Sequence, residues 1–368
     1  MTNGKANMMS QVKEPSGDNA SSSSREPGTT ITTTEAEERV VDAVQEPKNI
    51  KEALNDADWI TAMQNELHQF ERNKAPRAWY ERLSKFLLEN GFTRGKIDNT
   101  LFLKKRGRNL LIVQVYVDDI IFRAIADSLC EEFAKLMGSE FEMSMMGELS
   151  FFLGLQVKQS TKGTFICQHK YIKKLLKRFD MEASKVIDTP IATVTRLDMD
   201  ESGSPMNQTM YRGIIGSLLY LTISRLDIVF NVGLCARFQS NSKESHLKAA
   251  KRILRYLKGT QDLVLYYPSG DSFNLIGYAD ADYVGYLVDR KSTSGMAHFL
   301  GSCLISWGTR KQNSVTLSIT KAEYVVGASC YAQILWIKQQ LEDFGVYTNC
   351  VPLLYNNTNA HGQKSSST

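Results

Sequence analysis

The sequence predicts an α+β fold, and three observations lead to it. A helical apolar pattern begins near Pro76 and ends at Asn90-Gly91. Short apolar runs separated by turn residues fill 100–168, which is typical of a mainly antiparallel sheet. Helical patterns then occupy 211–257 before short strands return. Helices and strands that segregate along the chain in this way favour an α+β architecture.

Composition narrows the class of protein. A chain of 368 residues with 42% hydrophobic content can build two or three ordinary domains. The six cysteines are scattered without a CxxC pair, which argues against a zinc site or a disulfide framework and favours a reducing compartment. No apolar run reaches the roughly 18–20 residues of a membrane span, and the N-terminus lacks the apolar core of a signal peptide. We therefore expect an intracellular protein, cytoplasmic or nuclear.

The first half of the chain divides into three parts. Residues 1–47 are Ser- and Thr-rich with almost no aromatic side chains, so they bury too little apolar area to offset their ordering entropy and are predicted to be a disordered linker. Residues 48–73 carry apolar side chains at helical spacing and predict a short helical element. Residues 74–195 are expected to form one α+β unit. Its elements after the first helix are predicted at 100–104, 110–117, 120–122, 129–137, 150–159, 164–168 and 170–179.

The second half begins with a polar, turn-rich linker and continues as helices. Residues 196–270 are predicted to form a helical unit, and 271–360 a small α/β unit followed by a disordered tail at 361–368. The expected helices lie at 211–222, 227–238, 245–257 and 320–344, and the expected strands at 275–279, 295–300, 303–307 and 353–354.

The tetrad Tyr116-Val117-Asp118-Asp119 lies between two apolar strand-like runs. Adjacent carboxylates repel each other, and hairpin tips favour Asn-Gly or Asp-Gly over Asp-Asp. A divalent cation explains such a pair, because Mg²⁺ prefers hard oxygen ligands and serves two-metal phosphoryl transfer. The alternative is that the two acids only solvate a turn. The buried character of the flanking strands favours the metal-binding interpretation.

The tetrad and several further phrases resemble the Pol polyprotein of copia-type retrotransposons, in family order over roughly 48–360. The other phrases are Lys74–Tyr80, Phe152–Val157, Gln168–Tyr171, Thr189-Pro190, Tyr211–Leu221, Lys251–Thr260, Arg290–Gly295 and Ile305–Trp307. The resemblance implies a reverse-transcriptase palm and thumb remnant at 74–195, preceded by the N-terminal remnant of that domain at 48–73. It further implies a helical connection at 196–270 and an RNase H-like α/β domain at 271–360. The implied activities are RNA-directed DNA polymerase and ribonuclease H, with Mg²⁺ or Mn²⁺ as cofactor and RNA, DNA or RNA–DNA hybrid as partner.

The polymerase part departs from the family pattern. In the family, Asp118 and Asp119 act with a third carboxylate from an earlier strand beside the hairpin, and the phrase that carries it is absent here. The family's opening helix is followed almost at once by Lys74, so the fingers and half of the palm are missing between them. Asp56 and Asp58 fit better as an acidic pair at a helix start. We therefore expect an internally deleted chain without useful polymerase activity.

The RNase H-like part shows a similar departure. By resemblance its metal ligands are Asp280 and Glu323, for which the alternative is a pair of ordinary surface acids. Asn356 stands where the family has a third carboxylate, and a neutral amide is a weaker Mg²⁺ ligand. The family's fourth acidic position lies beyond the residue at which this sequence stops matching the family pattern. The resemblance thus implies a C-terminally truncated domain whose metal site is incomplete.

Positive charge is unevenly distributed. The net charge of the chain is +4, but residues 1–73 hold seven basic against thirteen acidic side chains. The remainder is therefore basic, and the helices at 170–179 and 245–258 could track a phosphate backbone. A solvated outer face is the alternative. The candidate nucleic-acid-binding residues on the second helix are Lys248, Lys251, Arg252, Arg255 and Lys258.

Three hypotheses follow. The first is a catalytically defective Pol fragment, and the second is a non-catalytic module that binds RNA or RNA–DNA hybrid. The third is an active polymerase that obtains its missing half from an intact copy in trans. Loss of interior strands exposes unpaired sheet edges, so we expect the 74–195 unit to be prone to aggregation.

Overall fold

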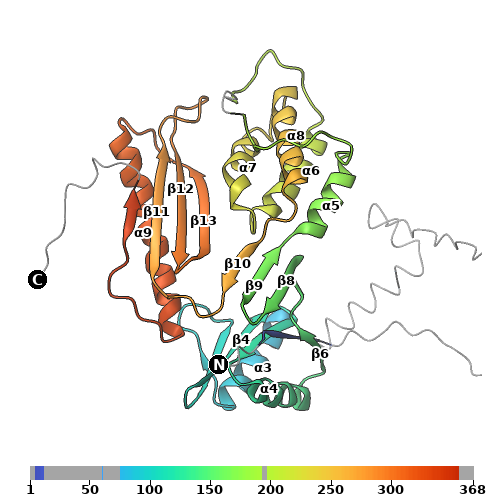
Figure 1. The fold of residues 1–368 in the computed structure, drawn as a ribbon, viewed down its shortest axis with the longest axis vertical. Helices are drawn as coiled ribbons and strands as arrows, with labels where there is room; N and C mark the ends of the chain where they lie inside the picture. Colours follow the sequence, from blue (N-terminus) through green and yellow to red (C-terminus); the bar gives the residue numbers. More distant parts are fainter. Residues whose placement is uncertain (1–4, 12–59, 61–74, 193–196, 356–368) are drawn as a thin grey trace, which may run out of the picture.

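The computed structural model describes residues 5–11, 60, 75–192 and 197–355 (Figure 1). The predicted helical element at 48–73 with Asp56 and Asp58, the tail at 361–368 and Asn356 lie outside the described residues, apart from residue 60 in a helix. The described parts build two four-stranded sheets, one six-stranded sheet and a group of helices. This mixture of helices with mainly antiparallel sheets confirms the predicted α+β class.

The six-stranded sheet carries the tetrad. Its strand order is β2-β3-β4-β5-β1-β6, and every neighbouring pair is antiparallel. Side chains of β4 alternate between buried and half-exposed, and the buried set packs with helices α3 and α4 in one apolar core. The bounds of these elements are β1 Asn7–Gln11, α3 Ala75–Glu89, β2 Thr93–Arg94, β3 Leu101–Arg106, β4 Asn109–Tyr116, β5 Asp119–Ala124, α4 Asp127–Glu140 and β6 Met143–Glu148.

Strand β1 corrects the prediction that 1–47 is disordered throughout. Residues 7–11 lie between β5 and β6 and pair with both of them. The Met9 side chain is only 2% exposed and belongs to the core of this sheet. Local composition gave no sign of this strand, because its order comes from contacts with segments more than a hundred residues away. Strand β6 was also not predicted, since its Met-Ser-Met-Met-Gly-Glu sequence lacks clear alternation.

A second sheet joins distant parts of the chain. Its order is β10-β9-β8-β7, and β10 pairs antiparallel with β9 although nearly a hundred residues separate them. The segment expected to be a separate connection at 196–270 therefore contributes a strand to the sheet of the preceding unit. The bounds are β7 Phe151–Phe152, β8 Leu155–Ser160, β9 Gly163–Cys167 and β10 Leu265–Pro268.

Five helices form the third group, at the upper right of Figure 1. Their apolar faces share one core around the fully buried Tyr211, whose hydroxyl donates to the carbonyl of Cys235 at 2.9 Å. The bounds are α5 His169–Arg178, α6 Gln208–Leu221, the 3₁₀ helix η1 Leu226–Ile228, α7 Val229–Ala236 and α8 Glu244–Gly259.

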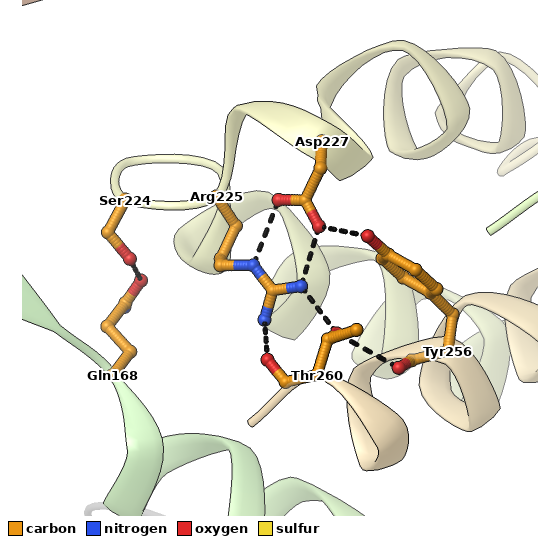
Figure 2. A network of polar contacts seen from close by, with 6 residues as sticks. All are labelled: Gln168, Ser224, Arg225, Asp227, Tyr256 and Thr260. Atoms are coloured by element: carbon orange, nitrogen blue, oxygen red, sulfur yellow. Dashed lines mark hydrogen bonds and ion pairs between the residues drawn. The ribbon is translucent and has the colours of Figure 1, made fainter. Parts of the chain in front are cut away.

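A buried polar network ties this group together (Figure 2). Arg225, 3% exposed, donates two hydrogen bonds to the carboxylate of Asp227 at 2.9 and 2.6 Å and two more to Thr260 at 2.9 and 2.7 Å. The Tyr256 hydroxyl also donates to Asp227, at 2.7 Å. Beside them, the Ser224 hydroxyl donates to Gln168 at the start of α5. Parts of the family phrases Gln168–Tyr171 and Lys251–Thr260 therefore serve packing between helices.

The last sheet has the order β13-β12-β11-β14, in which β14 alone runs parallel to its neighbour β11. Helix α9 packs against β11 and β12 through a small apolar core. The indole N–H of Trp307 donates to the carbonyl of Thr222 at 3.0 Å, which fixes this sheet against the helical group. The bounds are β11 Leu275–Asp282, β12 Thr293–Leu300, β13 Cys303–Lys311, α9 Ile319–Asp343 and β14 Leu353–Tyr355. No helix among the described residues is both long and apolar enough to cross a membrane.

Candidate functional site

The tetrad forms the tip of the β4–β5 hairpin, as the sequence predicted. Tyr116 pairs with Asp119, so Val117 and Asp118 are the two loop residues. Val117 has φ of 50°, a left-handed conformation that is unfavourable for a β-branched residue. Such a conformation costs roughly 1–3 kcal/mol and persists only where the surroundings impose it. The tip is therefore a strained element, and strain of this kind concentrates at functional sites.

Helix α3 and the β7–β8 hairpin hold the tip in place. The indole N–H of Trp79 donates to the carbonyl of Val117 at 3.1 Å. The Trp79 ring in turn packs edge-on against Phe141, with 4.9 Å between the ring centroids. On the other side, the Tyr116 ring meets Phe152 edge-on at 5.5 Å. The hydrogen bond from Trp79 to the hairpin is a contact that the sequence did not reveal.

The two tetrad carboxylates project from an open surface. Asp118 is exposed and Asp119 is half-buried. The strand beside β5 is β1, and its Ser10 lies opposite Asp119 in the antiparallel register. The sequence of β1, Asn-Met-Met-Ser-Gln, contains no acidic residue. Within the residues described, no three His, Cys, Asp or Glu side chains are grouped so that they could hold a metal ion.

A second acidic group lies where β11 meets α9. Glu323 is 4% exposed, and burial followed by the charge of Asp280 raises its pKa, against a smaller opposing effect of hydrogen bonding from the Ala281 backbone. Burial and the charge of Asp280 also raise the pKa of Asp282, while Arg237 acts in the opposite direction. Asp280 on β11 therefore lies near enough to Glu323 on α9 for its charge to act on that carboxyl, and their role as metal ligands stays a prediction. The structure adds Asp282, which the sequence reasoning missed although its i, i+2 spacing from Asp280 on a strand predicts the same face.

The arrangement leaves Glu323 with an unsatisfied atom. Its Oε2 is buried without a hydrogen-bond partner among the described residues, and a buried acceptor in that state is costly. A proton or a cation would satisfy it. The donors here are carboxylate oxygens, which suit Mg²⁺, and Mg²⁺ is often bound by one or two carboxylates plus water. Two carboxylates of this type are fewer protein ligands than a two-ion clamp needs.

Helix α8 presents less free positive charge than the sequence suggested. Arg252 donates to Thr189 through its side chain, at 2.9 Å to the hydroxyl and 3.2 Å to the carbonyl, and Lys258 donates to the carbonyl of Ser184 at 2.7 Å. Both are half-buried, and so are Lys251 and Arg255. Arg252 and Lys258 are therefore not freely exposed, because the 184–191 segment lies on this face of α8.

Lys248 is the exposed member of that set, and it pairs with Glu244 one turn away at 2.8 Å. Helix α5 is different, since all five of its Lys and Arg side chains are exposed. The role of either helix in nucleic-acid binding stays a prediction.

Comparison with known proteins finds the same family that the sequence motifs resemble. Residues 43–193 match the family model described as reverse transcriptase (RNA-dependent DNA polymerase). The chain is 36% identical over 282 residues to the retrovirus-related Pol polyprotein from transposon RE1 of Arabidopsis thaliana, covering 77% of this chain and 19% of that protein. It is 30% identical over 285 residues to the corresponding polyprotein from transposon TNT 1-94 of Nicotiana tabacum, covering 74% of this chain and 21% of that one.

Shorter relatives exist as well. An uncharacterized mitochondrial protein of Arabidopsis thaliana is 32% identical over 222 residues, which cover 60% of this chain and 92% of that protein. The chain spans only about a fifth of the length of the transposon polyproteins that it matches.

Proposed function

Because the chain belongs to the retrovirus-related Pol polyproteins of copia-type transposons, we propose that it is a Pol fragment derived from an RNA-directed DNA polymerase with ribonuclease H, and that neither catalytic centre is complete in it. Its substrates by descent are RNA, DNA and RNA–DNA hybrid. The two centres correspond to the tetrad and to the Asp280–Glu323 pair.

The composition of strand β1 carries the proposal for the polymerase centre. A family palm adds a third carboxylate from the strand beside the hairpin, and the strand in that position here has none. Positioning and charge neutralisation supply nearly all of the catalysis in phosphoryl transfer. With Asp118 and Asp119 alone, the alignment of two metal ions and the nucleotide phosphates is lost.

The order of the last sheet supports an RNase H-like unit at 271–360. Three antiparallel strands, a helix packed across them and a fourth strand parallel to the first follow the order that the family phrases imply. Asp280 and Glu323 would hold Mg²⁺ or Mn²⁺, which would neutralise charge on a scissile phosphate. The third family position is Asn356, a neutral residue, so we infer that the cation is held too weakly for cleavage.

A primer-extension assay tests the first centre. The full chain is incubated with a DNA primer on an RNA template and Mg²⁺ or Mn²⁺, with an intact copia-type reverse transcriptase as the positive control. We expect no extension above background. Extension that disappears in Asp118→Asn would overturn the proposal, because it would show that the tetrad catalyses.

A labelled RNA–DNA hybrid tests the second centre under the same ions. We expect the RNA strand to stay intact with the parent chain and with Asp280→Asn alike. Cleavage by the parent that is lost in Asp280→Asn would show that two carboxylates suffice at this site.

A further inference from the structure

Strand β1 fills the position between β5 and β6 in the six-stranded sheet. In the sheet order, β5 and β6 are separated by one strand position, and β1 fills it with antiparallel pairing on both sides. The rest of the six-stranded sheet comes from residues 93–148, whereas β1 comes from the far N-terminal part of the chain. Between β1 and α3 lie 63 residues. The occupant is therefore separate in sequence from the site that it fills.

The Gln159 side chain forms hydrogen bonds with the backbone of the segment that fills this position. Its Oε1 accepts from the N–H of Ala6 at 2.8 Å, and its Nε2 donates to the carbonyl of Ala6 at 2.9 Å. The N–H of Leu149 donates to the same carbonyl at 2.9 Å. A side-chain amide that pairs with both polar groups of one residue recognises an extended main chain whatever its side chains are. This contact extends the strand ladder by one residue.

One buried side chain gives the site its selectivity. Met9 enters the apolar core and is 2% exposed, whereas its neighbour Met8 lies on the opposite face and is half-exposed. Lys5 pairs with Glu148 at 2.7 Å, but both side chains are exposed, so this ion pair adds little. Burial of Met9 and the backbone hydrogen bonds are the dominant interactions.

We propose that the position between β5 and β6 is a strand-acceptor site that binds an extended peptide with an apolar side chain at the Met9 position, and that residues 5–11 of this chain are its occupant. Addition of the strand covers the edges of β5 and β6 next to the tetrad. Unpaired edges of this kind are the aggregation hazard that the sequence predicted for the 74–195 unit in general. The inference does not depend on the proposed loss of catalysis.

Cleavage of the full chain tests the proposal without deleting anything. A protease recognition sequence is inserted after Gly28, the purified chain is cut, and the products are separated by size exclusion. We expect a monomer before cleavage and continued co-elution of the 1–28 fragment with the remainder afterwards. A fragment that separates from the remainder would overturn the proposal.

Matched variants locate the binding. Met9→Asp should weaken retention of the 1–28 fragment in the cleaved chain, measured by dilution and size exclusion, by more than tenfold. Met8→Asp, the same change on the opposite face, should leave it bound. Gln159→Ala should weaken binding by about tenfold through loss of two hydrogen bonds, and Lys158→Ala should not.

Equal retention of the Met9→Asp and Met8→Asp fragments would show that the segment is held elsewhere and would refute the site. A dimer before cleavage that turns into monomers afterwards would assign the occupant to a second copy and refute the intrachain arrangement.

Discussion

Asp227→Asn should destabilise the helical group strongly, because it removes the charge that balances a buried guanidinium. Arg225 is 3% exposed, and its carboxylate partner receives three hydrogen bonds at 2.6–2.9 Å. An asparagine of the same shape can accept at one oxygen only, and its NH₂ group would face donors. The variant therefore leaves Arg225 buried with its hydrogen bonding to Thr260 but without a counter-charge (Figure 2).

The expected cost is about 3 kcal/mol. Removing one partner of a buried ion pair costs roughly 3–5 kcal/mol. The lower end applies here, because the Asp227 side chain is 30% exposed and Thr260 still accepts from two nitrogens. Burial alone would raise the pKa of Asp227, but hydrogen bonds from Arg225 and Tyr256 outweigh it and the pKa lies below its ordinary value. A lowered pKa means that this stabilisation is present above about pH 4 and is lost as the pH falls through the folded-state value.

Hydrogen exchange resolves the effect by region, since a chain with several cores need not unfold in one step. Opening free energies are measured for α8 in Asp227→Asn and for β12 in the control Asp289→Asn. The Asp289 side chain is 32% exposed, a fraction similar to that of Asp227. Its partner Lys311, whose Nζ lies 2.7 Å from the carboxylate, is 35% exposed, whereas Arg225 is buried. We expect a cost below about 1 kcal/mol for the control. Similar costs in both variants would refute the reasoning that burial of the cation sets the magnitude.

Two further predictions concern the candidate sites. Glu323→Gln should gain stability relative to the parent as the pH rises from about 4.5 to 7. Burial and the charge of Asp280 raise the pKa of Glu323. Ionising this group therefore lowers the free energy of unfolding of the parent, whereas glutamine does not ionise. Urea titrations across that pH range check this, and a pH-independent difference would contradict it. Trp79→Phe keeps the ring against Phe141 but removes the donor to Val117, so the hairpin tip should lose roughly 0.5–1 kcal/mol of local stability, seen as faster amide exchange at the tip. Trp336→Phe, at an exposed position of α9, is the matched control and should leave the tip unchanged.

The sequence by itself determined most of the regular elements and the family. Strong periodicity was sufficient for α3, the β4–β5 hairpin, the helices of the third group and α9, all of which lie within a few residues of their predicted bounds. It also placed Asp118 and Asp119 at a hairpin tip, and the family phrases named Asp280 and Glu323 as a candidate pair. These features are local, or they follow from family phrases that the chain retains.

Only the tertiary structure decided which distant segments meet. Strand β1 has no local signal, because the burial of Met9 and the amide clamp of Gln159 arise from residues far along the chain. The pairing of β10 with β9 and the cover that the 184–191 segment gives to Arg252 and Lys258 are non-local in the same way. Periodicity reports which face of an element is apolar, but it does not report what lies against that face. The tetrad is an example: the apolar pattern of β5 predicted a neighbouring strand, but only the structure shows that this neighbour is β1, which has no carboxylate.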